Sequence, residues 1–342
     1  MNELRLSLER VKEIAKLIKN VNICVIGDVC LDIYWRADMK KSKLSRETPH
    51  YPLPVVSEVY SPGGCGNVIN NVNALKPNKL SSISVIADDW RGFLLTKYFT
   101  DNKIDTNNLI KRKNGVTPCY CKPLRMGISD VVYEDPRLDF ENFEPIDEKT
   151  ENELLSIIER EAEKCDVIAV SDQFKCGIIT PKIRALLSKI SKKVPVIVDS
   201  RERANEYSGV IVKPNEIEAA FALGEDIIEK TLSLDDFVDL AERLYKKNQS
   251  PAAVTLGDKG ALWCDENGII YAPTKKAIGE IDIVGAGDTF LSAFSCAFAA
   301  TKNGAEALAF ANLASGVTVK KIGTTGTATE EEITKKWEEY YK

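Results

Sequence analysis

Short apolar runs rich in Val and Ile alternate with amphipathic segments along most of the chain, and this alternation constrains the fold more than any other feature. The runs are apolar at nearly every position, which is typical of strands buried on both faces. The segments between them suit crossover helices packed on a parallel sheet. The sequence therefore predicts an α/β fold with a mostly parallel sheet, with strands at 21–27, 83–87, 167–171, 195–199, 210–213 and 252–256 and helices at 152–164, 180–192 and 234–247.

Two stretches, residues 34–61 and 111–140, interrupt this rhythm with polar residues, prolines and short alternating pieces such as residues 55–60. The alternation is typical of β-ribbon. Both stretches follow strand-like segments, so they are candidates for a small β lid over a cleft at the carboxyl ends of the strands, where open α/β sheets bind ligands. Two long surface loops would fit the same composition equally well.

Composition narrows the functional classes. The chain has 342 residues, 44% of them hydrophobic, and a net charge of −5 without a basic block, so a sizeable core is expected and nucleic acid is not an expected partner. Residues 1–20 resemble an amphipathic helix rather than a signal peptide, and no apolar run is long enough to span a bilayer, so we expect no membrane insertion and a cytoplasmic location. Nine cysteines and a single histidine, His50, favour reduced thiols over disulfides, zinc sites or a histidine-dependent triad.

The segment Asp282–Phe294 carries the strongest chemical signal. Gly285, Ala286 and Gly287 let the backbone approach a ligand closely, and free N–H groups at a helix N-terminus can bind a phosphoryl group. The carboxylate of Asp288 in the same turn could take a proton from a hydroxyl aimed at that phosphate. A plain tight turn before a core helix fits this segment equally well. A dinucleotide fingerprint would need a glycine where Phe290 stands, and no P-loop sequence occurs in the chain.

Two earlier segments could meet a polar ligand. Gly63–Asn67 precedes a helix-like run, so Gly64 and Asn67 could contact sugar hydroxyls, although an asparagine helix cap is the simpler alternative. Asp32 follows the first predicted strand and could accept hydrogen bonds from a polyol, although acids at strand ends are often only turn formers.

Together these segments resemble the ribokinase-like (PfkB-type) carbohydrate kinases. Gly63–Asn67 and Asp282–Phe294 match the two glycine motifs of the family, and between them Asn215–Glu218 is similar to its Asn-x-x-Glu and Thr255–Gly260 to its Thr-x-Gly-x-x-Gly. Four motifs in the family's order are far more specific than any one of them. The resemblance implies a three-layer α/β/α core with a small β lid, and one kinase domain over residues 1–342.

The resemblance also implies roles for individual residues. Asp288 would be the catalytic base, and the amides of Gly285, Ala286 and Gly287 would form the anion hole. Asn215 and Glu218 would hold Mg²⁺ through water. The remaining residues would bind the two substrates: Thr255, Gly257, Gly260 and Asn312 the ATP, and Asp32, Gly64 and Asn67 the sugar. Val284 replaces the family's usual Thr, which leaves open a monovalent-cation site around Asp282.

Within the family, residues 27–35, 44–56 and 137–141 look like the branch that phosphorylates heptose 7-phosphate at the anomeric hydroxyl. The cations Lys41, Lys43, Arg46, Lys122 and Arg125 are candidate partners for the distal phosphate, and for any one of them a solvated surface charge is the alternative. A ribose, fructose or ketodeoxygluconate kinase is the runner-up within the class.

The alternative outside the enzymes is a protein of the same fold that binds a sugar or a nucleotide without catalysis. The presence of both Asp288 and the glycine turn argues against this alternative. Some relatives carry a second domain, a nucleotidyltransferase. The kinase motifs of this sequence end shortly before Lys342, and the single histidine, His50, cannot supply the pair of histidines that such a domain needs. We therefore expect only the kinase activity. Lid ribbons that pair between protomers would give a homodimer.

Overall fold

A computed structural model describes residues 2–227, 232–323 and 325–342. Its large sheet has ten strands in the order β1-β15-β14-β13-β12-β11-β10-β2-β5-β6. All neighbours from β13 to β6 pair in parallel, whereas β14 is antiparallel to both β13 and β15. This confirms the mostly parallel α/β sheet. The strands are β1 Asn2–Glu3, β2 Asn22–Gly27, β5 Lys79–Ala87, β6 Leu109–Arg112, β10 Val167–Asp172, β11 Val196–Ser200, β12 Ile211–Val212, β13 Ala252–Thr255, β14 Gly260–Asp265 and β15 Gly268–Pro273.

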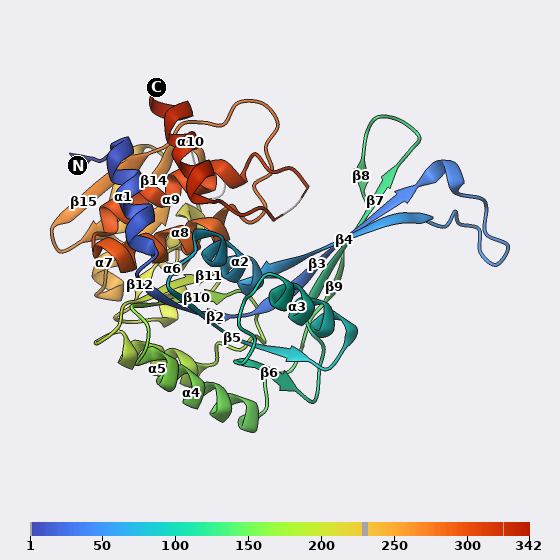
Figure 1. The fold of residues 1–342 in the computed structure, drawn as a ribbon, viewed down its shortest axis with the longest axis horizontal. Coiled ribbons are helices and arrows are strands. Elements are labelled where there is room, and N and C mark those ends of the chain that lie inside the picture. Colours follow the sequence, from blue (N-terminus) through green and yellow to red (C-terminus); the bar gives the residue numbers. More distant parts are fainter. Residues whose placement is uncertain (1, 228–231, 324) are drawn as a thin grey trace.

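Helices cover both faces of this sheet (Figure 1). Strand β2 shows why: Ile23 and Val25 are buried in the core on one face, and Cys24 and Ile26 in the core on the other. The first face is covered by α1 Leu8–Ile18, α2 Cys65–Leu75, α3 Trp90–Asp101, α8 Ala286–Thr301, α9 Gly304–Thr318 and α10 Glu330–Tyr341. The second is covered by α4 Glu148–Ala162, α5 Pro181–Ile190, α6 Glu216–Ala222 and α7 Leu234–Asn248.

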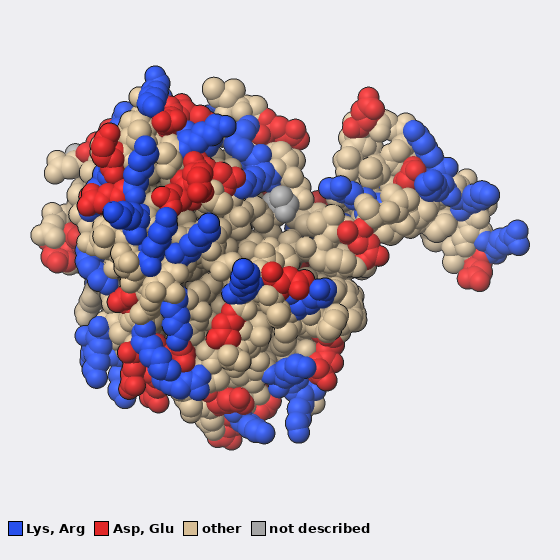
Figure 2. All heavy atoms as spheres, in the orientation of Figure 1, with Lys and Arg blue, Asp and Glu red and all other residues tan. Residues whose placement is uncertain are grey.

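A second, smaller sheet projects from the body of the molecule (Figure 1). It contains β3 Val29–Asp38, β4 Val55–Gly64, β7 Cys119–Met126, β8 Tyr133–Glu134 and β9 Leu138–Phe140. Strand β3 pairs with β4 on one side and with β7 on the other, and β8 and β9 both pair with β7. Its surface carries charges of both signs (Figure 2).

Three local expectations differ from the structure. Strand β3 begins at Val29 rather than near Tyr34, because it continues almost directly from β2 into the small sheet. Lys111 and Arg112, placed by the sequence in the second ribbon segment, belong to β6 and pair with β5 in the large sheet. The predicted helix over residues 1–20 begins only at Leu8, after Ser7 caps it, because Asn2 and Glu3 pair with β15 instead.

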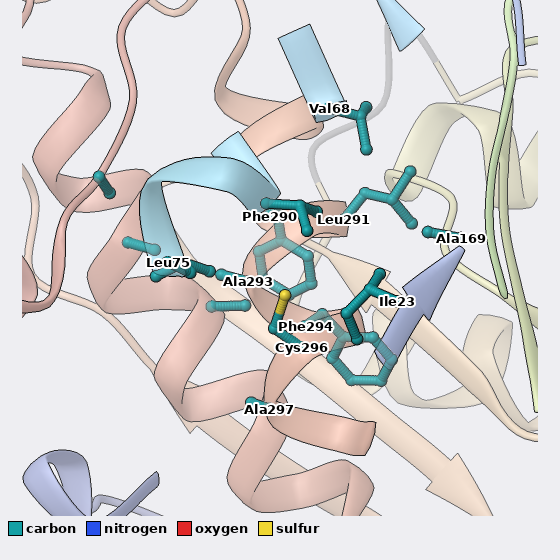
Figure 3. Close-up of a cluster of buried hydrophobic side chains, with 14 of the residues drawn as sticks. Ile23, Val68, Leu75, Ala169, Phe290, Leu291, Ala293, Phe294, Cys296 and Ala297 are labelled. Atoms are coloured by element: carbon teal, nitrogen blue, oxygen red, sulfur yellow. The ribbon is translucent and has the colours of Figure 1, made fainter. Parts of the chain in front are cut away.

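Helix α8 is held deep in the core by its aromatic residues (Figure 3). Phe290 and Phe294 stack with their ring centroids 6.1 Å apart, and both are buried in the same core as Ile23 and Ala169. Burial of such large side chains fixes the helix against β2 and β10. The N-terminus of α8 is therefore held firmly at the carboxyl end of the large sheet. No helix of the described residues is long and apolar enough to cross a membrane.

Candidate active site

The glycine turn before α8 has a backbone shape that requires glycine. Gly285 is the N-cap residue, with φ of 80°. A Cβ atom there would lie 2.6 Å from Nδ2 of Asn67, which is too close for any side chain. Asp282 fixes the preceding loop, because its carboxylate accepts hydrogen bonds from the backbone N–H groups of Val284 (3.0 Å) and Gly323 (2.9 Å). The first amides of α8 are thus presented to a ligand by a rigid turn.

Asp288 lies in the first turn of α8 and is held by a buried amide. Nδ2 of Asn67 donates a hydrogen bond to Oδ2 of Asp288 at 2.9 Å, and Asn71 in turn donates to Oδ1 of Asn67 at 3.1 Å. Burial raises the pKa of Asp288 to about 7 and nearby Asp199 adds to the rise, while the Asn67 hydrogen bond and Lys213 oppose it. A carboxylate whose pKa lies near neutrality is suited to general base catalysis.

Asp288 and Gly285 face a cavity of about 170 Å³, which we call the Asp32 cavity. Asp32 on β3 is buried, and that burial raises its pKa, against the opposing charges of Lys122 and Arg137. The cavity is polar on most sides, so it suits a hydroxylated and charged ligand. Its other lining residues are Gly64, Tyr120, Lys122, Arg137, Gln173, Phe174, Arg201, Val284 and Thr325.

Ala286 and Gly287 face a different cavity of about 220 Å³, the Asn312 cavity. All four residues predicted to bind the nucleotide line it: Thr255, Gly257, Gly260 and Asn312. Gly260 has φ of 111°, and a Cβ there would lie 2.2 Å from the carbonyl oxygen of Ala272. The same carbonyl accepts a hydrogen bond from Nδ2 of Asn312 at 2.8 Å, so this wall is built largely from backbone.

The glycine turn thus separates two cavities. Gly285 and Asp288 open onto the Asp32 cavity, while Ala286 and Gly287 open onto the Asn312 cavity. A group bound on one side could therefore reach a group bound on the other only across the N-terminus of α8. This is the arrangement that a two-substrate transfer reaction requires.

A buried ion pair lies beneath the turn. Nζ of Lys213 is 3.0 Å from Oδ2 of Asp199, and both side chains are buried. A Cβ atom on Gly287 would lie 3.9 Å from that Asp199 oxygen and 4.0 Å from Nζ of Lys213. The pair therefore supports the turn electrostatically. Sequence reasoning missed both residues; the run Lys213-Pro214-Asn215, directly before a motif that had been identified, was the available signal.

Asn215 and Glu218 lie behind this pair and line neither cavity. They form a capping box on α6: Oδ1 of Asn215 accepts from the N–H of Glu218 at 2.8 Å, and Oε2 of Glu218 accepts from the N–H of Asn215 at 2.9 Å. Burial raises the pKa of Glu218 to about 7, and Asp199 adds to this. Within the described residues, no cluster of three or more His, Cys, Asp or Glu side chains could hold a metal directly.

Comparisons with known proteins agree with this geometry. Residues 20–331 match the family described as pfkB family carbohydrate kinase. The chain belongs to this family. It is therefore a carbohydrate kinase, that is, a phosphotransferase.

Two curated relatives are similar over most of this pfkB-family chain. The bifunctional protein HldE of Aliarcobacter butzleri is 33% identical over 319 residues, which cover 92% of the chain and 64% of that protein. HldE of Nitratiruptor sp. is 33% identical over 318 residues, covering 91% and 64%. The chain thus spans a little under two thirds of the length of these relatives.

Solved structures share the ribokinase fold with this pfkB-family chain. Phosphofructokinase-2 from Escherichia coli, in complex with substrates and products, superposes with a TM-score of 0.72 at 18% identity, covering 94% of this chain and 100% of that one. Ribokinase of Arabidopsis thaliana, complexed with ribose and ATP, gives 0.67 at 18%, covering 93% and 99%. At this identity the likeness shows the fold.

The cations singled out in the sequence are dispersed in the pfkB-family structure. Of the five, only Lys122 lines the Asp32 cavity, where Nζ donates to the hydroxyl of Tyr34 at 2.9 Å. Arg125 pairs with Asp135 at 2.7 Å in the small sheet, away from the cavity lining. Lys41, Lys43 and Arg46 do not line it either, because they lie in the connection between β3 and β4.

Two other cations stand on the Asp32 cavity: Arg137, whose guanidinium is 4.1 Å from the ring centroid of Tyr120, and Arg201 after β11. Arg137 lies in a segment that resembled the heptose kinase branch, so a signal existed for it. Nothing in the local sequence indicated Arg201 or Thr325.

Proposed function

We propose that this kinase transfers the γ-phosphoryl group of ATP to the anomeric hydroxyl of heptose 7-phosphate or a closely related sugar phosphate. The observation that carries the proposal is the position of Asp288 on the turn between two cavities, with its pKa raised to about 7. The Asp32 cavity would hold the sugar, and the Asn312 cavity the nucleotide.

In this mechanism, Asp32 and Gly64 orient the sugar so that one hydroxyl faces the carboxylate of Asp288, whereas Asn67, also predicted to bind the sugar, is buried and does not line the cavity. Asn67 is itself fixed by Asn71, so it holds the base in position and keeps part of its charge on Oδ2. The carboxylate takes the hydroxyl proton as the oxygen attacks phosphorus. The amides of Gly285 and Gly287 face the charge that develops on the phosphoryl oxygens. The amide of Ala286, also expected in the anion hole, instead donates to the carbonyl oxygen of Ile283 at 3.1 Å.

Mg²⁺ is the metal that we propose for this site. Asn215 and Glu218 carry oxygen ligands, the type that Mg²⁺ prefers, but the single side-chain oxygen of Asn215 and one carboxylate oxygen of Glu218 already accept hydrogen bonds in the capping box of α6. Contact through metal-bound water is therefore the arrangement that fits the donors. When bound, the ion would neutralise charge on the nucleotide phosphates. A monovalent cation near Asp282 is a separate proposal. The structure gives it less support, because both carboxylate oxygens of Asp282 already accept backbone hydrogen bonds.

The charge on the Asp32 cavity supports a phosphorylated substrate. Lys122, Arg137 and Arg201 line a small cavity in which Asp32 and Asp288 are the acidic groups. Arg137 is already paired with Asp139, through Nε to Oδ1 at 2.6 Å and Nη2 to Oδ2 at 2.7 Å. Lys122 and Arg201 are therefore the cations that a distal phosphate would pair with. The likeness to HldE proteins agrees with the branch that the sequence resembles.

A coupled ADP-release assay with MgATP tests the proposal against heptose 7-phosphate, fructose 6-phosphate, fructose, ribose and ketodeoxygluconate. We expect the highest kcat/KM with heptose 7-phosphate. Preference for another phosphorylated sugar would overturn the heptose assignment and leave the cation argument standing. Preference for ribose or another neutral sugar would overturn both, and binding of ATP without turnover of any sugar would point to a silent binding protein.

We also propose that the chain forms a homodimer through the small sheet. Strand β4 is an edge strand of that sheet, and Val55, Val56 and Tyr60 on it are exposed, as is Leu138 of β9. Exposed apolar edges of this kind are usually covered in the native assembly. Light scattering during gel filtration should give twice the chain mass, and Val56→Lys should shift the protein toward monomer. A wild-type monomer at tens of micromolar would overturn this proposal.

A further inference from the structure

A third cavity lies at the other end of the carboxyl edge of the large sheet, where no motif of the reaction falls. Its volume is about 360 Å³, and we call it the Arg112 cavity. It is bounded by Asp28 after β2, Val85 of β5, Arg112 of β6, and the loop 174–178 after β10. Because β10, β2, β5 and β6 are neighbours in the sheet, the cavity lies where open α/β sheets bind ligands.

Arg112 lines this cavity as a buried cation without a close ion-pair partner among the described residues. The residue is only 9% exposed, and Nε donates a hydrogen bond to the carbonyl oxygen of Asn114. Within the part of the chain that the structure describes, no carboxylate oxygen lies within 4.0 Å of its nitrogens, and neither Nη atom has a hydrogen-bond partner. Burial lowers the pKa of Arg112, and the charge of Asp147 opposes this change from beyond ion-pair distance. Buried cations are normally paired, so the site lacks an anion.

The other polar groups of the cavity either already make hydrogen bonds within the protein or lie at the exposed rim. Asp28 accepts hydrogen bonds from the backbone N–H groups of Gln173 (3.2 Å), Phe174 (3.0 Å) and Ile178 (2.6 Å), which occupy most of the acceptor positions of its carboxylate. The amide of Asn142 is used in both directions by Val116. Lys175 is exposed and adds a second positive charge, and the negative charges on the lining are the exposed Glu141 and the buried Asp28.

We propose that the Arg112 cavity binds a phosphoryl group, either as free phosphate or as part of a small phosphorylated metabolite, with Arg112 as its principal contact and Lys175 at the rim. A guanidinium with both Nη atoms uncommitted matches the paired oxygens of a phosphate. The volume leaves room for a few atoms beyond the phosphate itself.

The same geometry couples this cavity to the Asp32 cavity. The loop after β10 forms a wall of both: Gln173 and Phe174 line the Asp32 cavity, and Phe174 and Cys176 line the Arg112 cavity. The ring of Phe174 lies edge-on to Tyr120 with centroids 6.1 Å apart. A ligand beside Arg112 would therefore change the position of Phe174 and so the affinity for the sugar. By thermodynamic linkage, the sugar would change the affinity for that ligand by the same factor. This coupling rests on the proposed function, whereas the binding of phosphate does not.

The binding test uses calorimetric titration of the full-length protein with inorganic phosphate and, separately, glycerol 3-phosphate. Saturating non-hydrolysable ATP analogue with Mg²⁺ is present, so that the anion hole of α8 is occupied. We expect saturable binding that Arg112→Gln weakens at least about tenfold, the scale of one lost charge-assisted pair. Lys111→Gln is the matched control, because Lys111 is the adjacent cation of β6, is exposed and pairs with Asp88. It should bind as the wild type does.

Two further variants keep the test decisive if Arg112→Gln folds poorly. Lys175→Gln, at an exposed rim position, should weaken binding about two- to fivefold without affecting folding, as expected for an exposed charge. Arg112→Lys should retain part of the affinity. Tighter binding of glycerol 3-phosphate than of phosphate assigns the site to a metabolite, and equal binding assigns it to free phosphate.

Absence of saturable binding up to about 10 mM, or equal binding by wild type and Arg112→Gln, overturns the proposal; that limit corresponds to an affinity of only about −2.7 kcal/mol. Sugar KM is then measured with and without the bound anion. An unchanged sugar KM would overturn the coupling alone, while an inactive protein that still binds phosphate would separate this site from the proposed function.

Discussion

The Asn312 and Asp32 cavities are built from different materials, although only the turn of Gly285–Gly287 separates them. Glycine, alanine, serine and threonine make up half of the residues that line the Asn312 cavity, and Asn312 itself is tied to a strand carbonyl. Most residues that line the Asp32 cavity carry charged, aromatic or amide side chains, and they come from the small sheet and several loops. A wall of glycines and small residues presents backbone to the ligand, whereas a wall of long side chains can change with the substrate.

The largest effect should come from the one side chain on which both cavities depend. Asp288→Asn removes the proton acceptor but keeps an oxygen that can accept the hydrogen bond of Asn67, so the fold of the turn is retained. We expect kcat to fall about 10³-fold, with both KM values within a few-fold. Steady-state kinetics with both substrates varied measures this. Asp235→Asn, at an exposed carboxylate of α7, is the control; a wild-type rate in Asp288→Asn would remove Asp288 from the role of base.

The turn itself supplies the next effect. Gly285→Ala places a Cβ atom 2.6 Å from Nδ2 of Asn67 in a backbone conformation that alanine adopts poorly, so Asn67, Asp288 or the turn must shift. A shift of this size costs about 10²-fold in kcat. Gly287→Ala is the comparison, because its added Cβ meets no atom closer than 3.9 Å and should retain most of the activity. Equal losses in the two variants would mean that the lack of space beside Asn67 is not what requires glycine at position 285.

The two cavities should respond independently to substitution. Asp32→Asn removes a buried charge that would bind sugar hydroxyls, so sugar KM should rise about 10- to 30-fold while ATP KM stays within about twofold. Asn312→Ala should show the mirror image, raising ATP KM and leaving sugar KM unchanged. Two-substrate kinetics distinguishes the cases. A parallel rise of both KM values in either variant would break the assignment of one cavity to each substrate.

The pH dependence of the rate should report Asp288. The burial that raises its pKa to about 7 favours the protonated acid, which cannot accept the hydroxyl proton. We therefore expect kcat/KM for the sugar to be full above about pH 8, to fall as pH drops through 7, and to lose about tenfold per unit below 6, because kcat/KM reports the free enzyme. Rates from pH 5.5 to 9 at limiting sugar concentration test this. A flat profile down to pH 5.5 would mean that the base titrates at the ordinary pKa of a carboxyl group.

The sequence predicted the Asn312 cavity better than the Asp32 cavity, for a physical reason. Thr255, Gly257 and Gly260 are close in sequence, so one short motif that resembles the family was enough to name all three. Arg201, Tyr120 and Thr325 reach the Asp32 cavity from three distant segments, so their meeting depends on how the small sheet is placed. The same reason explains why five cations were named from the small-sheet segments and only Lys122 lines the cavity.

The sheet was predictable because its signal is repeated and local. The apolar runs matched β2, β5, β10, β11, β12 and β13, and each is buried on both faces as continuous hydrophobicity implies. Chain ends and ribbons were harder. Residues such as Asn2 and Lys111 form strand because a distant strand is available to pair with them. Pairing between distant segments leaves little trace in the local sequence.

The smallest expected effect separates the role of Asp288 in catalysis from its role in stability. Its pKa is raised from 3.8 in the unfolded chain to about 7 in the folded one, so between these values the native state binds the extra proton. Stability must then decrease as pH rises from about 4 to 7, because the charged carboxylate is held in a site that burial makes unfavourable. Asp288→Asn removes this charge. Its Tm relative to wild type should therefore increase between pH 5 and pH 8, by roughly 2–4 °C. Differential scanning fluorimetry at both pH values measures the difference, with Asp235→Asn as control. A Tm difference that is independent of pH would show that burial does not raise the pKa of Asp288, and the pH dependence expected for kcat/KM would then have to come from another group.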